Sequence, residues 1–232
     1  MVGEVIEGRI ALFGGTFNPI HYGHLRVAEE VAEQLRLERV EFLPAALPPL
    51  RDRPEVAPSL RLKMVELALQ QNRRFRLNPI EQQRCGTSYT VDTLLEWQRQ
   101  REGQPMPFWL MGADAFVKLH CWSRWRQLLT LCRLVVMTRP GYPLRDETLA
   151  EPLQPLWQRR VGVAELDSAT AALAEVVEVA VTPLEISASA IRQQLARGGS
   201  IRYLTPDSVI QLIEQHGCYA AKEIEQIEEY AE

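Results

Sequence analysis

The sequence predicts an α/β fold: a doubly wound, Rossmann-like parallel sheet with helices on both faces and a small helical part at the C-terminus. Short apolar segments alternate with helical segments along the 232 residues, an order typical of parallel sheets with right-handed crossovers. Residues 108–111 and 134–137 are apolar throughout, as in strands that are covered on both faces. A glycine pair also ends the first apolar segment shortly before a helix.

The elements follow from hydrophobic spacing and from start and stop residues. Strands are expected at residues 9–13, 39–43, 75–80, 108–111 and 134–137 and within residues 177–186. Helices are expected at residues 22–37, 59–72, 90–101, around 122–131, and at 164–176, 188–197 and 205–217. Ser59 is the expected N-cap of its helix. Residues 139–156 are rich in proline and glycine and predict a long surface loop.

The composition indicates one globular domain at residues 1–220, with its C-terminal helices at 188–217, followed by an acidic tail at 221–232. A net charge of −4 argues against a nucleic-acid partner that needs a broad basic surface. Neither a membrane span nor a signal peptide is expected. The four cysteines are scattered, which favours free thiols in a reducing cytoplasm. We expect a monomer or a small homo-oligomer.

The most informative segment is FGGTFNPIHYGHL, residues 13–25. Gly14, Gly15 and Thr16 follow a strand, and His21 and His24 share one face of the next helix. Glycine N–H groups and a helix N-terminus favour phosphate binding. A simple tight turn or a metal site built on the histidines are the alternatives, although no third ligand lies nearby. The pattern is neither a dinucleotide-binding G-x-G-x-x-G fingerprint nor a P-loop.

A second segment, ISASAIR at residues 186–192, begins another helix. Ser187 and Ser189 are suited to helix capping. Together with Arg192 they also form a possible second phosphate clamp. Two further residues have ordinary structural interpretations, because Asp114 is suited to a helix N-cap and Trp122 to the core.

These segments together resemble the bacterial nicotinate mononucleotide adenylyltransferases, a branch of the nucleotidyltransferase superfamily with the T/HxGH motif. The resemblance extends from residue 9 to residue 219. Its landmarks are FGGTFNPIHYGHL, LPPLRDRP (47–54), SYTVDTL (88–94), MGAD (111–114), TRPG (138–141) and ISASAIR. The first motif alone specifies the superfamily, and its combination with the others specifies the branch.

The resemblance implies adenylyl transfer from ATP to nicotinate mononucleotide, giving deamido-NAD and pyrophosphate. The implied catalytic residues are His21, His24 and Arg192. The implied ATP-binding residues are Gly14, Gly15, Thr16, Gly112, Asp114, Ser187 and Ser189. The implied nicotinate mononucleotide-binding residues are Tyr89, Thr90 and Trp122. Mg²⁺ is expected to be held mainly by the ATP phosphates, with no metal ligands from the protein.

The chain departs from the family pattern at several positions. Asn18 replaces an aspartate and is expected to shape its loop by hydrogen bonding. Leu50 replaces a histidine, which removes that side chain as a substrate contact. Thr87 replaces a proline, and His120 and Cys121 replace Pro-Thr.

Other functions remain open on the sequence. The acceptor of the same reaction could be nicotinamide mononucleotide or phosphopantetheine, although phosphopantetheine has no ring to stack on Trp122. A nucleotide-binding regulator without catalysis and a metal-dependent hydrolase are alternatives from other classes.

Overall fold

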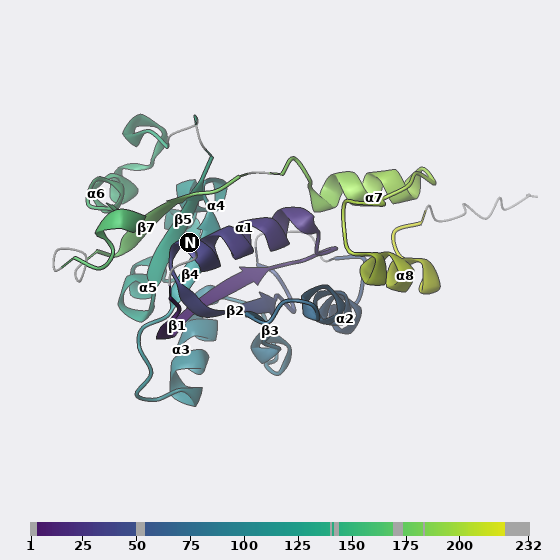
Figure 1. Cartoon of the computed structure of the whole chain (residues 1–232), viewed down its shortest axis with the longest axis horizontal. Coiled ribbons are helices and arrows are strands. Elements are labelled where there is room, and N and C mark those ends of the chain that lie inside the picture. Colours follow the sequence, from purple (N-terminus) through teal and green to yellow (C-terminus); the bar gives the residue numbers. More distant parts are fainter. Residues whose placement is uncertain are drawn as a thin grey trace, which may run out of the picture.

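A single parallel sheet forms the centre of the protein in the computed structural model, which describes residues 4–49, 54–139, 141, 144–168, 174–182 and 184–220 (Figure 1). The strand order is β3-β2-β1-β4-β5-β7-β6, and each neighbouring pair is parallel. The strands are β1 (Ile6–Gly15), β2 (Leu37–Pro44), β3 (Phe75–Leu77), β4 (Phe108–Gly112), β5 (Arg133–Thr138), β6 (Val161–Gly162) and β7 (Val176–Ala180). The doubly wound fold class is therefore confirmed.

Helices cover both faces of this sheet. They are α1 (Tyr22–Gln34), α2 (Pro58–Leu69), α3 (Thr90–Gln100), α4 (Ala113–Val117), α5 (Trp125–Leu131), α6 (Gln154–Gln158), α7 (Ala188–Ala196) and α8 (Asp207–Gln215). Successive side chains of a strand point to opposite faces, and β1 shows this clearly. Ala11 and Phe13 join the core shared with α1, α2, α7 and α8, whereas Ile10 and Leu12 join the core shared with α3, α4, α5 and α6.

The strand order reverses between β1 and β4. From β1 the chain proceeds outward through β2 to β3, and it then returns to place β4 on the other side of β1. In open parallel sheets, ligands bind at such a reversal, beyond the carboxyl ends of the strands. Helices α7 and α8 lie at this end of the sheet, near the start of α1 (Figure 1).

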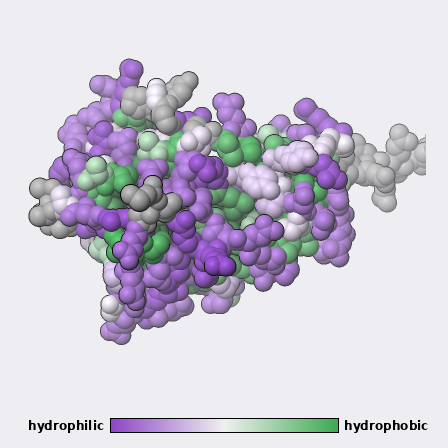
Figure 2. All heavy atoms as spheres, in the orientation of Figure 1, coloured by the Kyte–Doolittle hydropathy of each residue, from purple (hydrophilic) through white to green (hydrophobic). Residues whose placement is uncertain are grey.

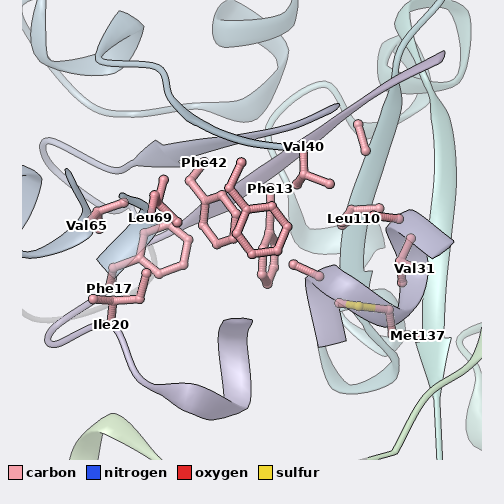
Figure 3. Close-up of a cluster of buried hydrophobic side chains, with 14 of the residues drawn as sticks. Phe13, Phe17, Ile20, Val31, Val40, Phe42, Val65, Leu69, Leu110 and Met137 are labelled. Atoms are coloured by element: carbon pink, nitrogen blue, oxygen red, sulfur yellow. The ribbon is translucent and has the colours of Figure 1, made fainter. Parts of the chain in front are cut away.

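An aromatic cluster fills the core under the end of β1. The rings of Phe13 and Phe17 lie 5.7 Å apart, and those of Phe13 and Phe42 lie 5.4 Å apart (Figure 3). Phe17 has a φ of 45°, which is uncommon for a residue other than glycine. Its buried ring fixes this conformation, so the chain turns sharply just after the strand.

Two expectations for the chain after β5 are wrong. Residues 139–156 are not only surface loop, because Leu149, Leu153 and Leu156 are buried and α6 begins within this range. In the described residues of the expected helix at 164–176, the structure has instead a short 3₁₀ turn, Val163–Glu165, and the start of β7. Backbone pairing with β5, which begins at Val176, overrides the helix expected at the end of this range. Residues 169–173 lie outside the described part of the chain.

The remaining boundaries shift by a few residues. Ser59 is not the N-cap of α2, because Ala57 occupies that position and Pro58 begins the helix. The acidic tail and Leu50 lie outside the described residues. None of the helices within the described ranges is long and apolar enough to cross a membrane. On the face in Figure 2, hydrophilic side chains cover most of the surface, and hydrophobic ones gather near α1 and the segment between β7 and α7.

A buried carboxylate connects β2 to α3. Glu41 is 2% exposed and accepts hydrogen bonds from Trp97 Nε1 (3.0 Å) and Asn78 Nδ2 (2.8 Å). Arg39 and Arg101 form ion pairs with it at 2.9 and 3.0 Å. Burial alone would raise the pKa of Glu41, but these hydrogen bonds and the charge of Arg101 lower that pKa below its ordinary value.

We expect Glu41→Gln to reduce the free energy of unfolding at pH 7 by about 2 kcal/mol, because buried donors lose a charged acceptor. A lowered carboxylate pKa stabilises the fold above the unfolded-state pKa, and this contribution disappears as the pH falls through the folded-state pKa. The difference between the variant and the wild type should therefore shrink in acid. Urea denaturation at several pH values measures this difference in the free energy of unfolding, with the exposed Glu33→Gln as control. A difference that does not change with pH would contradict a lowered pKa for Glu41.

Candidate active site

The loop between β1 and α1, residues 15–21, is held by its carbonyl groups. The acceptor and donor pairs are Gly15 O and Ala45 N (2.8 Å), Thr16 O and Arg61 Nη1 (2.6 Å), Asn18 O and Arg192 Nη1 (2.8 Å), and Ile20 O and Thr205 Oγ1 (2.7 Å). In a trans peptide the N–H points opposite to the C=O. The Thr16 N–H therefore points away from β2, toward the side of β4 where the strand order reverses.

Gly14 is required by a close approach between β1 and β4. A Cβ atom at this position would lie 2.6 Å from the ring of Trp109, which is itself 3% exposed. A rigid, buried ring cannot move aside, so any larger residue would displace the end of β1. Gly14, Gly15 and Thr16 are half-buried. They lie where the strand order reverses between β1 and β4, which is where the sequence predicts a phosphate-binding site.

His21 and His24 lie against each other at the start of α1. Their ring centroids are 3.7 Å apart with an angle of 32° between the planes. His21 is the N-cap residue and is 5% exposed, and burial lowers its pKa from 6.5 to about 4. The ring is therefore neutral at pH 7 in the unliganded protein.

The hydrogen bonds of the two imidazoles indicate where their protons lie. The Nδ1 atom of His24 accepts a hydrogen bond from the His21 backbone N–H at 3.3 Å, so a neutral His24 carries its proton on Nε2. The Nδ1 atom of His21 is buried without a partner and lies by the backbone of Gly23, where a Cβ would approach to 2.9 Å. Buried polar atoms without partners are rare in native proteins, so this ring is an unusual feature of the loop.

The ISASAIR segment reaches the same loop. Besides its bond to Asn18 O, Arg192 lies 3.5 Å from the hydroxyl of Ser189. Ser187 Oγ accepts a hydrogen bond from Ala190 N at 3.1 Å, so the capping interpretation of this residue is confirmed. Both serines are exposed, and their hydroxyls remain accessible to a ligand.

Tyr89 and Thr90 lie at the start of α3, where Tyr89 is the N-cap residue and is 38% exposed. Trp122 is half-buried just before α5. An ion pair between Arg124 and Asp92 connects these two segments. The side chain of Ser88 accepts hydrogen bonds from the N–H groups of Ala46 (3.1 Å) and Leu47 (3.2 Å), which holds the start of α3 against the segment after β2.

Gly112 and Asp114 follow β4. The parallel register that pairs Leu12 with Trp109 carries Gly112 to the level of Gly15. Gly112 is the N-cap residue of α4, so the capping interpretation of Asp114 is wrong. The exposed Asp114 folds back, and its Oδ1 would lie 2.5 Å from a Cβ at position 112.

Sequence reasoning missed two residues behind the loop. Arg61 is fully buried and bonds to Thr16 O, and the hydroxyl of Tyr219 donates to Asn18 Oδ1 at 2.6 Å. The loop-shaping role expected of Asn18 agrees with this contact. An arginine in register with Val65 and Leu69, on the buried face of α2, was the available signal for Arg61. Within the described ranges, no group of His, Cys, Asp and Glu residues is arranged to hold a metal ion.

The chain is similar to known proteins over most of its length. A model of the cytidylyltransferase-like family matches residues 12–194. A protein of Dechloromonas aromatica named "Probable nicotinate-nucleotide adenylyltransferase" is 42% identical over 212 residues, which cover 90% of this chain and 97% of the relative. A relative of the same name from Pseudomonas aeruginosa is also 42% identical, over 92% of this chain and 98% of its own length.

The chain belongs to the nicotinate-nucleotide adenylyltransferase family. Two solved structures of nicotinic acid mononucleotide adenylyltransferase from Plasmodium falciparum share its fold. The one complexed with NaAD has a TM-score of 0.67 and 15% identity, and it covers 91% of this chain and 97% of its own. The one complexed with APC has a TM-score of 0.66 and 13% identity, and it covers 91% of this chain and 96% of its own.

The buried His21 ring predicts a loss of stability in mild acid. Because its folded pKa lies below its unfolded pKa, the unfolded chain binds the proton more strongly between these two values. We expect the contribution of His21 to lower the free energy of unfolding as the pH falls from 6.5 to 4, by up to about 3 kcal/mol. In urea titrations, the free energy of unfolding of His21→Asn should depend less on pH in this range, whereas the exposed His216→Asn should behave like the wild type. The same pH dependence in the wild type and both variants would contradict the burial of a neutral ring.

Proposed function

We propose that this chain transfers the adenylyl group of ATP to nicotinate mononucleotide, which gives deamido-NAD and pyrophosphate. The observation that carries the proposal is the close His21–His24 ring pair beside a loop in which Gly15 O and Thr16 O bond to Ala45 and Arg61. The names of the family relatives support the choice of substrates.

The chemistry requires positioning more than covalent catalysis. The acceptor brings its own nucleophile, a phosphate oxygen that attacks the α-phosphorus of ATP in line while pyrophosphate leaves. Two like charges about 4 Å apart repel by about 4 kcal/mol at an effective dielectric of about 20. The protein has to offset this repulsion and to align the reacting atoms.

His21 and His24 donate hydrogen bonds from Nε2 to the phosphates of ATP in this proposal. For His24, the backbone bond at Nδ1 leaves the proton on Nε2. For His21, Nδ1 faces the first turn of α1, where backbone N–H groups are the donors, and this favours the same tautomer. Neutral donors aimed at developing charge stabilise the transition state without a large solvent reorganisation.

The other groups divide between the two substrates. The N–H of Thr16 holds the acceptor phosphate, whereas the N–H of Gly15 faces β2 in the parallel pairing of Gly15 with Pro44. Arg192 with Ser187 and Ser189 binds the leaving pyrophosphate. Gly14 gives the backbone its close approach, and Gly112 and Asp114 contact the ATP ribose and adenine.

The pyridine ring of the acceptor stacks on Trp122 beside Tyr89. The N–H of Thr90, at the start of α3, is suited to the nicotinate carboxylate because a helix N-terminus favours anions. Mg²⁺, bound mainly by the ATP phosphates, neutralises charge on them when present. We expect the reaction in the cytoplasm, by a monomer or a small homo-oligomer, with neither nucleic acid nor membrane as a partner.

His24→Ala should lower kcat at least about 100-fold while the protein stays folded, since a single aligned donor contributes on this scale. Pyrophosphate release from ATP and nicotinate mononucleotide measures the rate, with circular dichroism as the test of folding. His216→Ala, on the exposed end of α8, is the matched control. Near wild-type turnover by a folded His24→Ala protein would refute the role of this residue.

Acceptor choice tests the substrate separately. With ATP present, kcat/KM should be higher for nicotinate mononucleotide than for nicotinamide mononucleotide, because only the carboxylate carries a charge for the α3 N-terminus. A preference for the amide would overturn the substrate and leave adenylyl transfer intact. ATP binding without pyrophosphate release for either acceptor would favour a regulator, and activity that depends on zinc would favour a hydrolase.

A further inference from the structure

Arg61 occupies an unusual position behind the β1–α1 loop. Its guanidinium donates to three backbone carbonyls, Thr16 O (2.6 Å), Ala46 O (3.1 Å) and Val56 O (3.3 Å). The acceptors belong to the β1–α1 loop, the segment after β2 and the segment before α2. The side chain is fully buried, so it cannot touch a ligand on the open side of the loop.

The charge of Arg61 has no ion-pair partner in the part of the chain that the structure describes. Burial lowers the pKa of its guanidinium, yet arginine stays protonated in proteins because its ordinary pKa is so high. A buried charge without a counter-charge is costly for folding. The three carbonyl dipoles solvate the charge of Arg61, but they do not neutralise it.

The peptide group after Thr16 connects this charge to the open side of the loop. Its C=O points at Arg61, so its N–H, on Phe17, points the opposite way. A cation at the oxygen end polarises the peptide and strengthens the positive end of its dipole. The positive potential therefore extends through the loop toward the place where the proposed triphosphate lies.

We propose that Arg61 is a positioning residue whose buried charge is compensated by the polyphosphate of the bound nucleotide. It acts through the β1–α1 loop, which it also holds to the segment after β2. This inference rests on the proposed function only in taking the loop as the nucleotide's phosphate site; it does not depend on which acceptor is used.

Such a role makes a prediction that a purely structural role does not. If Arg61 only held three segments in place, Arg61→Lys would lose as much ATP affinity as Arg61→Gln, because lysine cannot make the forked hydrogen bonds. If the charge of Arg61 acts on the phosphates, the loss of affinity in Arg61→Gln must grow with the number of phosphates on the ligand. The conservative variant should also separate charge from shape, because lysine keeps the charge and gives up the forked geometry.

The test is a calorimetric titration of the full-length protein with AMP, ADP and ATP. Arg61→Gln should weaken the affinity for ATP at least about tenfold and the affinity for AMP by no more than about threefold, because charge–charge attraction scales with ligand charge. The ATP affinity of Arg61→Lys should be closer to that of the wild type than the ATP affinity of Arg61→Gln is. Lys63→Gln removes a cation from the same helix at an exposed site, and it should change none of the three affinities by more than about twofold.

Equal losses for AMP, ADP and ATP in Arg61→Gln would overturn the electrostatic role. Should this variant fail to fold, as judged by circular dichroism, Arg61→Lys decides: it should retain most of the wild-type gain in affinity from AMP to ATP, and loss of that gain overturns the proposal. A wild type that binds ATP but releases no pyrophosphate with nicotinate mononucleotide would refute the proposed function. The affinity series would still test Arg61 in that case.

Discussion

The geometry of the site depends on the capture of loop carbonyls by donors from distant parts of the chain. The β1–α1 loop has no regular secondary structure of its own between Gly15 and Tyr22. Ala45, Arg61, Arg192 and Thr205 each hold one of its carbonyls. Because C=O and N–H point opposite ways in a trans peptide, the capture of Gly15 O and Thr16 O directs the N–H groups of Thr16 and Phe17 to the other side of the loop. A loop that would be mobile alone becomes a fixed set of donors.

This arrangement also explains why the two histidines can be so close. His21 is buried and neutral, and stacking at 3.7 Å would be unfavourable for two imidazolium rings. In the proposed function, anion binding at this loop draws on hydrogen-bond donors, on Arg192 at the site and on the buried charge of Arg61 behind the loop. The division suits a site that has to bring two anionic substrates together and then release two anionic products.

Much of the fold could be predicted from the sequence because its central strands are hydrophobic on both faces. Residues 108–111 and 134–137 are predicted correctly within β4 and β5, and the glycine pair marks the end of β1. The chain after β5 was predicted less well, because pairing of β7 with β5 is a long-range contact that local propensity does not report. Of the candidate site, the motifs predict the residues that are proposed to contact the ligand. They do not identify Arg61 or Tyr219, whose roles depend on burial behind the loop.

The contacts of the loop with the C-terminal region have a consequence for how the protein is made. The partners of Asn18 and Ile20 lie 174, 185 and 201 residues further along the chain, at Arg192, Thr205 and Tyr219. During synthesis, domains emerge and fold from the N-terminus, so the loop is translated almost first and receives its supports almost last. The last of these supports is made only when translation is nearly complete. The candidate site therefore reaches its final geometry after all the strands of the sheet have been synthesised.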